Sequence, residues 1–327
     1  MAADAASPRP SLGALPAGLF GAVMGLAGLG LAWRRAEGAL TFASELWCAL
    51  GVLALVLVGA GYAAKALRHP QSVRAELENP ALVGFCAALP VGMTLAAGAL
   101  RPWALPVAHA VWWGGVGLLA ALQLWALSRF LRGGLQAAQV NGGWMILFVG
   151  GIVVPSSGLD LGHALVSQWF FGASAAAAPF VMGAVLWRTL FGPPLPAAAK
   201  PSTFILLVPP SLVYANGIAL GAAESPYLQG LFFSGLVLLV ALLVAMRDCW
   251  RWPFGAPWWA FTFPLDAMAA AAGLHAELHP EGPWRLVARA VLWLATAVVV
   301  IVLARTVLAL RGGRLFLPPP PPPGPAE

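Results

Sequence analysis

The sequence predicts an all-α membrane protein with ten transmembrane helices, and three observations support this fold class. Charged residues make up 9% of the 327 positions, against about 25% in soluble globular proteins. Hydrophobic residues make up 60%, more than one soluble core can bury, so most of them must face lipid or one another inside a bilayer. The apolar runs are long and uninterrupted, which excludes the alternating pattern of membrane β-strands.

Ten apolar runs, each bounded by charged residues or by glycine and proline, predict the individual helices. In chain order they cover residues 15–33, 46–64, 80–100, 105–130, 144–162, 165–190, 202–223, 227–246, 257–276 and 284–310. The connections are short, so successive helices should form five antiparallel hairpins. Together they predict one transmembrane domain at residues 12–316. It is flanked by a flexible tail at 1–11 and a proline-rich tail at 317–327, where proline cannot continue a helix.

The distribution of Lys and Arg predicts the orientation of the chain. An even number of helices places both termini on one side, and 13 of the 18 cationic residues fall on that side. The other five are Arg34, Arg35, Arg101, Arg285 and Arg289. Because cytoplasmic loops are enriched in Lys and Arg, we expect a multi-pass protein of the cell membrane with both termini cytoplasmic, as in a bacterial inner membrane. Cations scattered between apolar segments do not form a nucleic-acid-binding face.

Interior prolines fall mainly in the odd-numbered helices. They are Pro90 in the third, Pro155 in the fifth, Pro209 and Pro210 in the seventh and Pro264 in the ninth, while Pro179 is the one interior exception in an even helix. Each proline frees a backbone carbonyl, which is tolerated at membrane depth only where protein or water satisfies it. We therefore expect kinked odd helices that line a central pore, with the even helices outside. The alternative is that the prolines only permit tight helix packing.

Small and hydroxyl residues accompany these prolines. Thr94, Ser156, Ser211 and Thr262 can cap freed carbonyls or line water, which makes them candidate pore-lining residues. In the first helix, the pair of glycines at 21 and 25 has the GxxxG spacing. This spacing predicts that a neighbouring helix approaches closely.

Three segments resemble a known family. The sequences PAGLFGAVMGLAGLGLAWR at 16–34, VRAELENP at 73–80 and above all WWAFTFPLD at 258–266 are similar to the tellurite-resistance/dicarboxylate transporter family of TehA-like proteins, which includes the plant slow-type anion channels. The resemblance spans roughly residues 12–316. It implies a ten-helix protomer, usually one of a homotrimer, that passes small inorganic or organic anions through its own pore. It also implies that Phe263, the aromatic residue before the motif proline, is the pore gate.

Asp266 departs from the family pattern, in which a small or hydroxyl residue is common. It follows Phe263 by three residues and so lies on nearly the same helix face. A carboxylate at membrane depth is costly and usually functional. Asp266 could point into a hydrogen-bonded contact between helices, pair with a cation, or be protonated and couple transport to H⁺. The last option defines an alternative function, a proton-coupled carrier of a C4-dicarboxylate or a similar small acid, or a tellurite-resistance exporter.

The histidines give weaker signals. His275, Glu277 and His279 close the ninth helix with a spacing that permits a metal cluster, but they lack the HExxH order, and a solvated helix end is the favoured interpretation. His109 and His163 are expected near opposite membrane edges.

The remaining polar residues indicate no catalysis. Arg74, Glu76 and Glu78 are expected to form local ion pairs in an interfacial segment. The chain has no GxSxG, HExxH or nucleotide-binding glycine motif, and its three cysteines have no metal-ligand spacing. We therefore expect neither an enzyme nor a cofactor, and the partners we expect are anions, membrane lipid and further copies of the chain.

Overall fold

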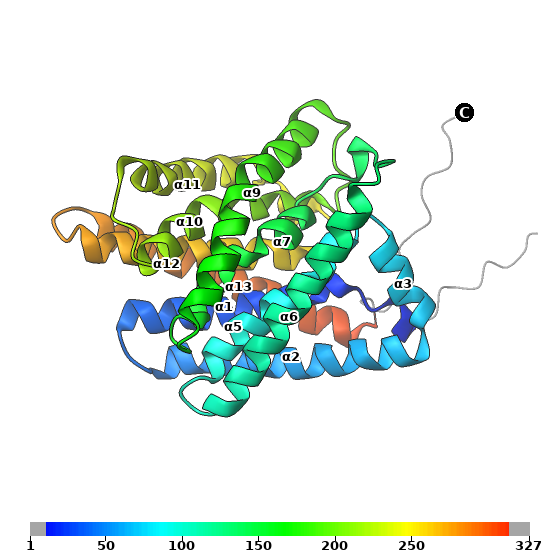
Figure 1. Ribbon diagram of the computed structural model, residues 1–327, viewed down its shortest axis with the longest axis horizontal. Coiled ribbons are helices and arrows are strands. Elements are labelled where there is room, and N and C mark those ends of the chain that lie inside the picture. The colour runs from blue at the N-terminus through cyan, green and yellow to red at the C-terminus, as the bar shows by residue number, and fades with distance from the viewer. Residues whose placement is uncertain (1–10, 314–327) are drawn as a thin grey trace, which may run out of the picture.

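The computed structural model describes residues 11–313, and within this range the regular structure is helical, without strands (Figure 1). The predicted C-terminal tail at 317–327 and the predicted N-terminal tail, apart from Ser11, lie outside the described residues. Eight helical segments in this range are long and apolar enough to cross a membrane. The segment Gly143–Gly158 is apolar but shorter, and Ala256–Leu278 is not among the eight.

Five long helices, here called the outer helices, are uninterrupted. They are α2 (Phe42–Arg68), α6 (Leu105–Phe130), α9 (Ala164–Phe191), α11 (Pro226–Ala245) and α13 (Trp284–Arg311). Local capping explains where two of them begin. The Thr41 hydroxyl accepts a hydrogen bond from the Ser44 amide before α2, and the Ser225 hydroxyl accepts one from the Leu228 amide before α11.

Five further segments, here called the inner segments, consist of consecutive shorter helices, several of them 3₁₀ helices (η). They are η2 (Ala17–Phe20) with α1 (Gly21–Glu37), α4 (Val83–Cys86) with α5 (Ala88–Leu100), α7 (Gly143–Val149) with η4 (Gly150–Val153) and α8 (Pro155–Gly158), η5 (Lys200–Leu207) with α10 (Val208–Ala219), and η7 (Ala256–Phe261) with α12 (Thr262–Leu278). The connections contain η1 (Leu12–Ala14), α3 (Pro70–Glu78), η3 (Ala137–Gln139) and η6 (Cys249–Arg251).

The predicted prolines mark the breaks inside these segments, but each break separates two helices and is not a kink in one continuous α-helix: α4 and α5 are both α-helices, and the other segments change between 3₁₀ and α-helix. Pro155 is the first residue of α8, Pro209 and Pro210 are the second and third of α10, and Pro90 and Pro264 are the third of α5 and α12. Amides in the first turn of an α-helix have no carbonyl partner within that helix, so proline fits there at little cost. Pro179, in contrast, lies inside α9.

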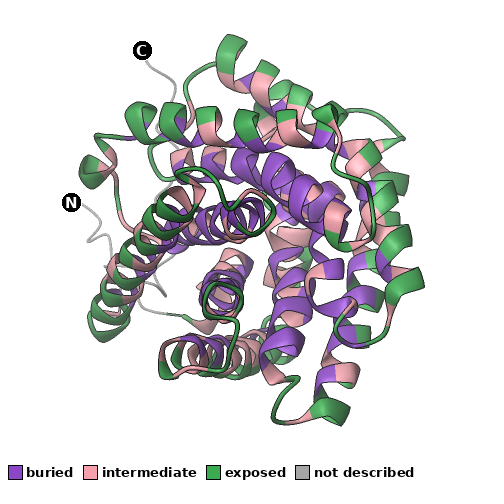
Figure 2. Ribbon diagram, turned by 90° about the vertical axis from the view of Figure 1, so that its left-hand side faces the viewer, coloured by how far each residue is buried: buried purple, intermediate pink, exposed green. Residues whose placement is uncertain are grey.

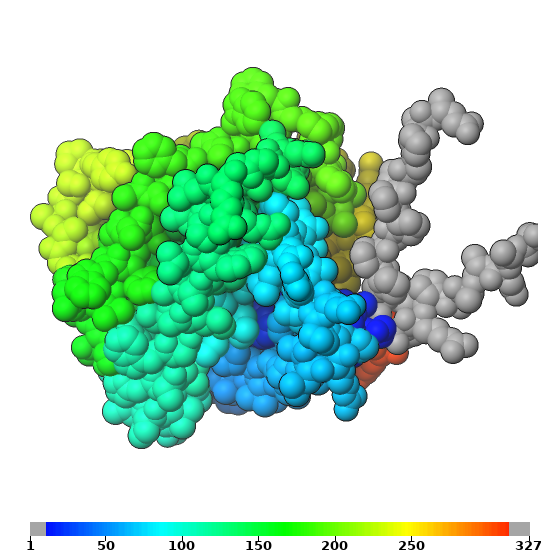
Figure 3. Space-filling view, turned by 45° about the vertical axis from the view of Figure 1, so that its right-hand side comes forward, coloured from blue at the N-terminus to red at the C-terminus, as the bar shows by residue number. Residues whose placement is uncertain are grey.

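Burial separates the two kinds of segment. In the three inner segments among these eight, 72% to 78% of the residues in the most apolar stretch are buried, against 11% to 28% in the outer helices. Figure 2 shows the buried residues gathered on the central helices, with exposed ones around the periphery. In the space-filling view of one side, only a small patch of the dark blue N-terminal segment is visible between later parts of the chain (Figure 3).

The inner segments contact one another in a closed ring. Helix α1 packs against α5, and α5 packs against η4 and α8. Both η4 and α8 contact α10, α10 packs against α12, and α12 packs against α1, which closes the ring. Each inner segment also packs against the outer helix that follows it in the chain. The chain thus encloses a central space with residues from five separate segments.

Candidate functional site

Two cavities meet in the centre of the ring. Both are lined by residues from all five inner segments. No residue of an outer helix lines either of them. The lining residues are apolar or glycine, and the two cavities share Met24, Ile146, Ile205, Val208 and Phe263.

Phe263 lies where these cavities meet. It is the second residue of α12, directly after the junction with η7, and its side chain is 6% exposed. On one side its ring faces Gly28 of α1, since a Cβ placed on Gly28 would lie 3.0 Å from Cδ2 of Phe263. The ring therefore fills space between α1 and the two cavities.

Asp266 lies beside Phe263 on the same face of α12, as their spacing predicted. A Cβ placed on Gly28 would lie 3.0 Å from Oδ2 of Asp266 as well. Both carboxyl oxygens of Asp266 are buried, and neither has a hydrogen-bond partner among the described residues. Two expectations for this residue are therefore not met: among residues 11–313, Asp266 neither joins a hydrogen-bonded contact between helices nor pairs with a cation. An ionised carboxylate in such a place would lack any compensation for lost hydration.

The predicted hydroxyl residues mostly bond to their own helix. Thr94, Ser211 and Thr262 donate hydrogen bonds of 2.8 Å to the carbonyl oxygens of Val91, Leu207 and Trp259, respectively. These three residues are buried, and none of them lines either of the two cavities. Their hydroxyls are thus satisfied by carbonyls three or four residues earlier.

Ser156 instead takes part in a contact between two inner segments. Its hydroxyl accepts a 3.0 Å hydrogen bond from the side-chain amide of Asn216 on α10, which also donates a 2.6 Å bond to the carbonyl of Ile152. Asn216 is not among the residues predicted from the sequence to line the pore. An amide side chain within a long apolar run was the available signal, because such a group needs an internal partner at membrane depth.

The paired glycines bring two inner segments together. A Cβ on Gly21 would lie 2.9 Å from Cβ of Trp259, and one on Gly25 would overlap the side chain of Thr262. This confirms the predicted close approach and identifies the neighbouring segment as η7 with α12. The face of α1 that carries these glycines therefore sets the position of the helix that carries Phe263.

Charged residues in the last turn of α1 are paired. Arg34 forms two short hydrogen bonds with the carboxylate of Glu45, of 2.6 and 2.7 Å, and donates to the carbonyls of Gly98 and Ala99 at the end of α5. Such charge-assisted and bidentate bonds are among the stronger ones in proteins. This cation therefore ties α1, α2 and α5 together at one end of the ring.

The expected ion pairs of the interfacial segment form only in part. In α3, Arg74 pairs with Glu78 at 2.7 Å, as predicted. Glu76 instead pairs with Lys65 of α2 at 2.8 Å and accepts a 2.7 Å hydrogen bond from Tyr62. The local interpretation was wrong for Glu76, because α3 folds back against α2.

The histidines form two clusters, and both differ from the arrangements favoured by the sequence. His109 and His163 do not lie at opposite membrane edges, since Nδ1 of one is 2.9 Å from Nε2 of the other. Burial lowers the pKa of His163 below its ordinary value of 6.5, and the neighbouring His109 adds to this effect.

The second cluster corrects the expectation of a solvated helix end. His275 is 2% exposed, and Glu277 turns away to pair with Arg35 at 2.8 Å. His279 pairs with Glu224, which lies in the connection between α10 and α11. Together, Glu224, His275 and His279 have the donor atoms that could hold a metal ion.

Comparisons with known proteins point to one family. The profile of a family described as "Voltage-dependent anion channel" matches residues 14–307. The "Tellurite resistance protein TehA homolog" of Haemophilus influenzae is 27% identical over 265 residues, which cover 79% of this chain and 80% of that protein. The "Guard cell S-type anion channel SLAC1" of Arabidopsis thaliana is 23% identical over 318 residues, which cover 91% of this chain and 56% of that protein. An uncharacterised transporter of Methanocaldococcus jannaschii is 26% identical over 229 residues, which cover 61% of this chain and 65% of that protein.

Proposed function

The chain belongs to the voltage-dependent anion channel family, and from this membership we propose that it passes small anions across a membrane through the centre of its ring of inner segments. The family match agrees with the resemblance seen in the sequence motifs. The proposal assumes the ten-helix plan that the sequence predicts, in which five inner segments surround an axis and five outer helices face lipid.

One observation carries the proposal. Two cavities lined by all five inner segments meet at a single aromatic side chain, Phe263. An aromatic ring in a narrow apolar passage excludes ions by filling it and keeping it dry. Phe263 is therefore the proposed gate, which opens when its ring or the start of α12 moves aside.

The breaks in the inner segments supply a preference for anions. Helices α5, α10 and α12 each begin within their segment, beside Pro90, Pro209 and Pro264. The amino end of a helix has a partial positive charge and free amides, which favour an anion nearby. The apolar lining binds an anion only weakly, and weak binding permits rapid passage.

Each protomer contains a complete ring, so the proposed pore does not require a second copy of the chain. We propose a homotrimer of independent pores in the cell membrane, with both termini cytoplasmic. Lipid would contact the exposed apolar faces of the outer helices.

Asp266 favours a second candidate, a proton-coupled carrier of a C4-dicarboxylate or a similar small acid, or an exporter that confers tellurite resistance. The observation behind it is the pair of buried carboxyl oxygens that have no hydrogen-bond partner in the described part of the chain, one turn from the proposed gate. A neutral acid is far less costly there than a carboxylate, and proton transfer to and from such a group can accompany substrate movement.

Reconstitution in a planar bilayer tests the two candidates. A channel gives a reversal potential that follows the anion gradient, with currents that need no pH gradient. A coupled carrier gives substrate uptake driven by a pH gradient and no unitary current. Purified, folded protein that supports neither would contradict both proposals.

A further inference from the structure

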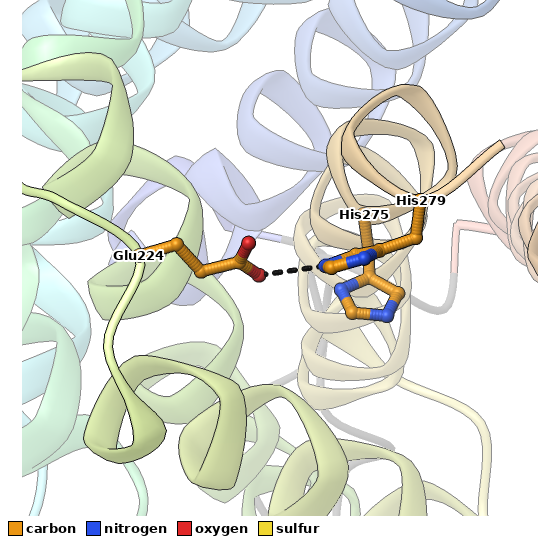
Figure 4. Close-up of side chains that lie close together, drawn as sticks. All are labelled: Glu224, His275 and His279. Atoms are coloured by element: carbon orange, nitrogen blue, oxygen red, sulfur yellow. Dashed lines mark hydrogen bonds and ion pairs between the residues drawn. The ribbon is translucent and has the colours of Figure 1, made fainter.

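We propose that Glu224, His275 and His279 form a binding site for a divalent transition-metal ion, with Zn²⁺ as the best-matched class. Figure 4 shows the Glu224 carboxylate pointing toward the two imidazole rings, which come from the end of α12. One donor atom from each residue lies within 4.8 Å of the other two. Neither the motifs nor the family match assigns a metal to this chain.

The distances are close to those that a metal requires. Donor atoms around a tetrahedral Zn²⁺ lie about 3.3 Å apart when each is about 2.0 to 2.1 Å from the metal. Nε2 of His279 is 2.9 Å from Oε1 of Glu224, a hydrogen-bonded separation that opens by a few tenths of an ångström when a metal replaces the proton. Two imidazoles and one carboxylate are a common donor set for zinc and do not suit calcium or magnesium, which prefer oxygen alone.

The environment of His275 holds one ligand in position. Its Nδ1 is 2.8 Å from the hydroxyl of Tyr214, which also donates a 3.4 Å hydrogen bond to Glu224. The ring stacks on Phe232 with centroids 4.0 Å apart, and its edge meets Trp284 at 4.7 Å. A buried ligand with a fixed orientation loses little freedom when it binds a metal.

The other two ligands give access from solvent. The side chains of His279 and Glu224 are 35% and 23% exposed, whereas His275 is buried. His279 follows the last residue of α12, one turn after His275, so both imidazoles lie on one face. A metal here would join the end of α12 to the connection that follows α10.

The test is zinc binding by the untagged full-length protein in detergent, measured by competition with a chelating fluorophore and by metal content after dialysis. The variants are His279→Gln and Glu224→Gln, which change the two accessible ligands and leave the buried His275 in place. The matched control is His109→Gln, which removes a histidine from the other imidazole cluster.

We expect one Zn²⁺ per chain in the unchanged protein and in His109→Gln. Each of the other two variants should bind at least about tenfold more weakly, since even the indirect supports of a metal site contribute that much. Equal affinity in all four proteins, loss of binding in His109→Gln alone, or no retained zinc in the unchanged protein would overturn the proposal. The measurement does not depend on anion transport.

Discussion

The ring of Phe263 lies against the backbone of Gly28, so closely that a methyl group there would come within 3.0 Å of the ring carbon Cδ2. A glycine on α1 thus sets the distance between α1 and the side chain of the proposed gate. Gly28→Ala should push the aromatic ring toward the cavities that it already lines. We expect a lower anion flux per folded protein and a loss of stability of about 1 kcal/mol, the low end for overpacking, because the cavities leave room.

Flux into proteoliposomes, normalised to folded protein, measures this effect. Gly59→Ala in α2 is the control, because a Cβ at that position would meet nothing within 4 Å. An unchanged flux in Gly28→Ala would show that the gap between α1 and Phe263 does not limit passage.

Phe263→Ala should raise anion conductance and leave the preference for anions over cations unchanged. The substitution empties the place where the two cavities meet and adds no charge. If Phe263 merely filled a core, its truncation would lower the free energy of unfolding by about 3 to 5 kcal/mol and would not increase the current. Single-channel recording and thermal unfolding distinguish these outcomes.

Phe261→Ala is the matched control for this substitution. Phe261 is 7% exposed, packs against Phe204 and Trp258, and lines neither cavity. It should lose stability without a gain in conductance. If well-folded Phe263→Ala protein has the same current as the unchanged protein, the gate lies elsewhere.

Asp266→Asn should separate the two candidate functions. Asparagine keeps the shape of the neutral acid but cannot exchange a proton. For a channel, we expect folded protein whose anion currents and their pH dependence are retained. Loss of pH-driven uptake in folded Asp266→Asn protein would instead support the proton-coupled carrier, and the measurement is substrate uptake with and without a pH gradient.

The imidazole pair of His109 and His163 should make stability depend on pH. The pKa of His163 is lowered in the folded protein, so the unfolded chain binds this proton more readily. This contribution to stability is present above pH 6.5 and is lost as the pH falls through the lower, folded pKa. Unfolding in detergent between pH 8 and pH 5 should show this loss, and His163→Gln should reduce it. An identical pH profile in the variant would mean that other groups cause the dependence.

The positions of the inner segments could be predicted from single residues. Pro90, Pro155, Pro209 and Pro264 all fall in segments of the contact ring, because a residue without an amide donor is disfavoured in lipid-exposed helix interiors. Pro179, inside the outer helix α9, is the exception. Their local geometry could not be predicted. Whether a chain passes from a 3₁₀ to an α-helix before a proline depends on packing against neighbouring segments, which one sequence does not contain.

Contacts between distant segments were the other feature beyond prediction. Glu224 lies 51 positions before His275 and has no special spacing from it. Glu76 pairs with Lys65 of α2 and not with Arg74, the neighbouring cation expected to pair with it. In each case the charges meet because a connection between helices folds back against a helix that is distant from it in the chain or precedes it. The direction of such a fold depends on the whole packed structure and not on any local pattern.

The composition of Ala256–Leu278 has a consequence for how the protein is made. This segment carries the proposed gate and Asp266, yet it is not among those apolar enough to cross a membrane unaided. A carboxylic side chain near its centre opposes partition from the translocon into lipid. We expect it to enter the bilayer together with α13, the next helix in the chain, which packs along it. Since α12 is also the segment that returns to α1, biogenesis would close the ring only when the hairpin of α12 and α13 has left the ribosome.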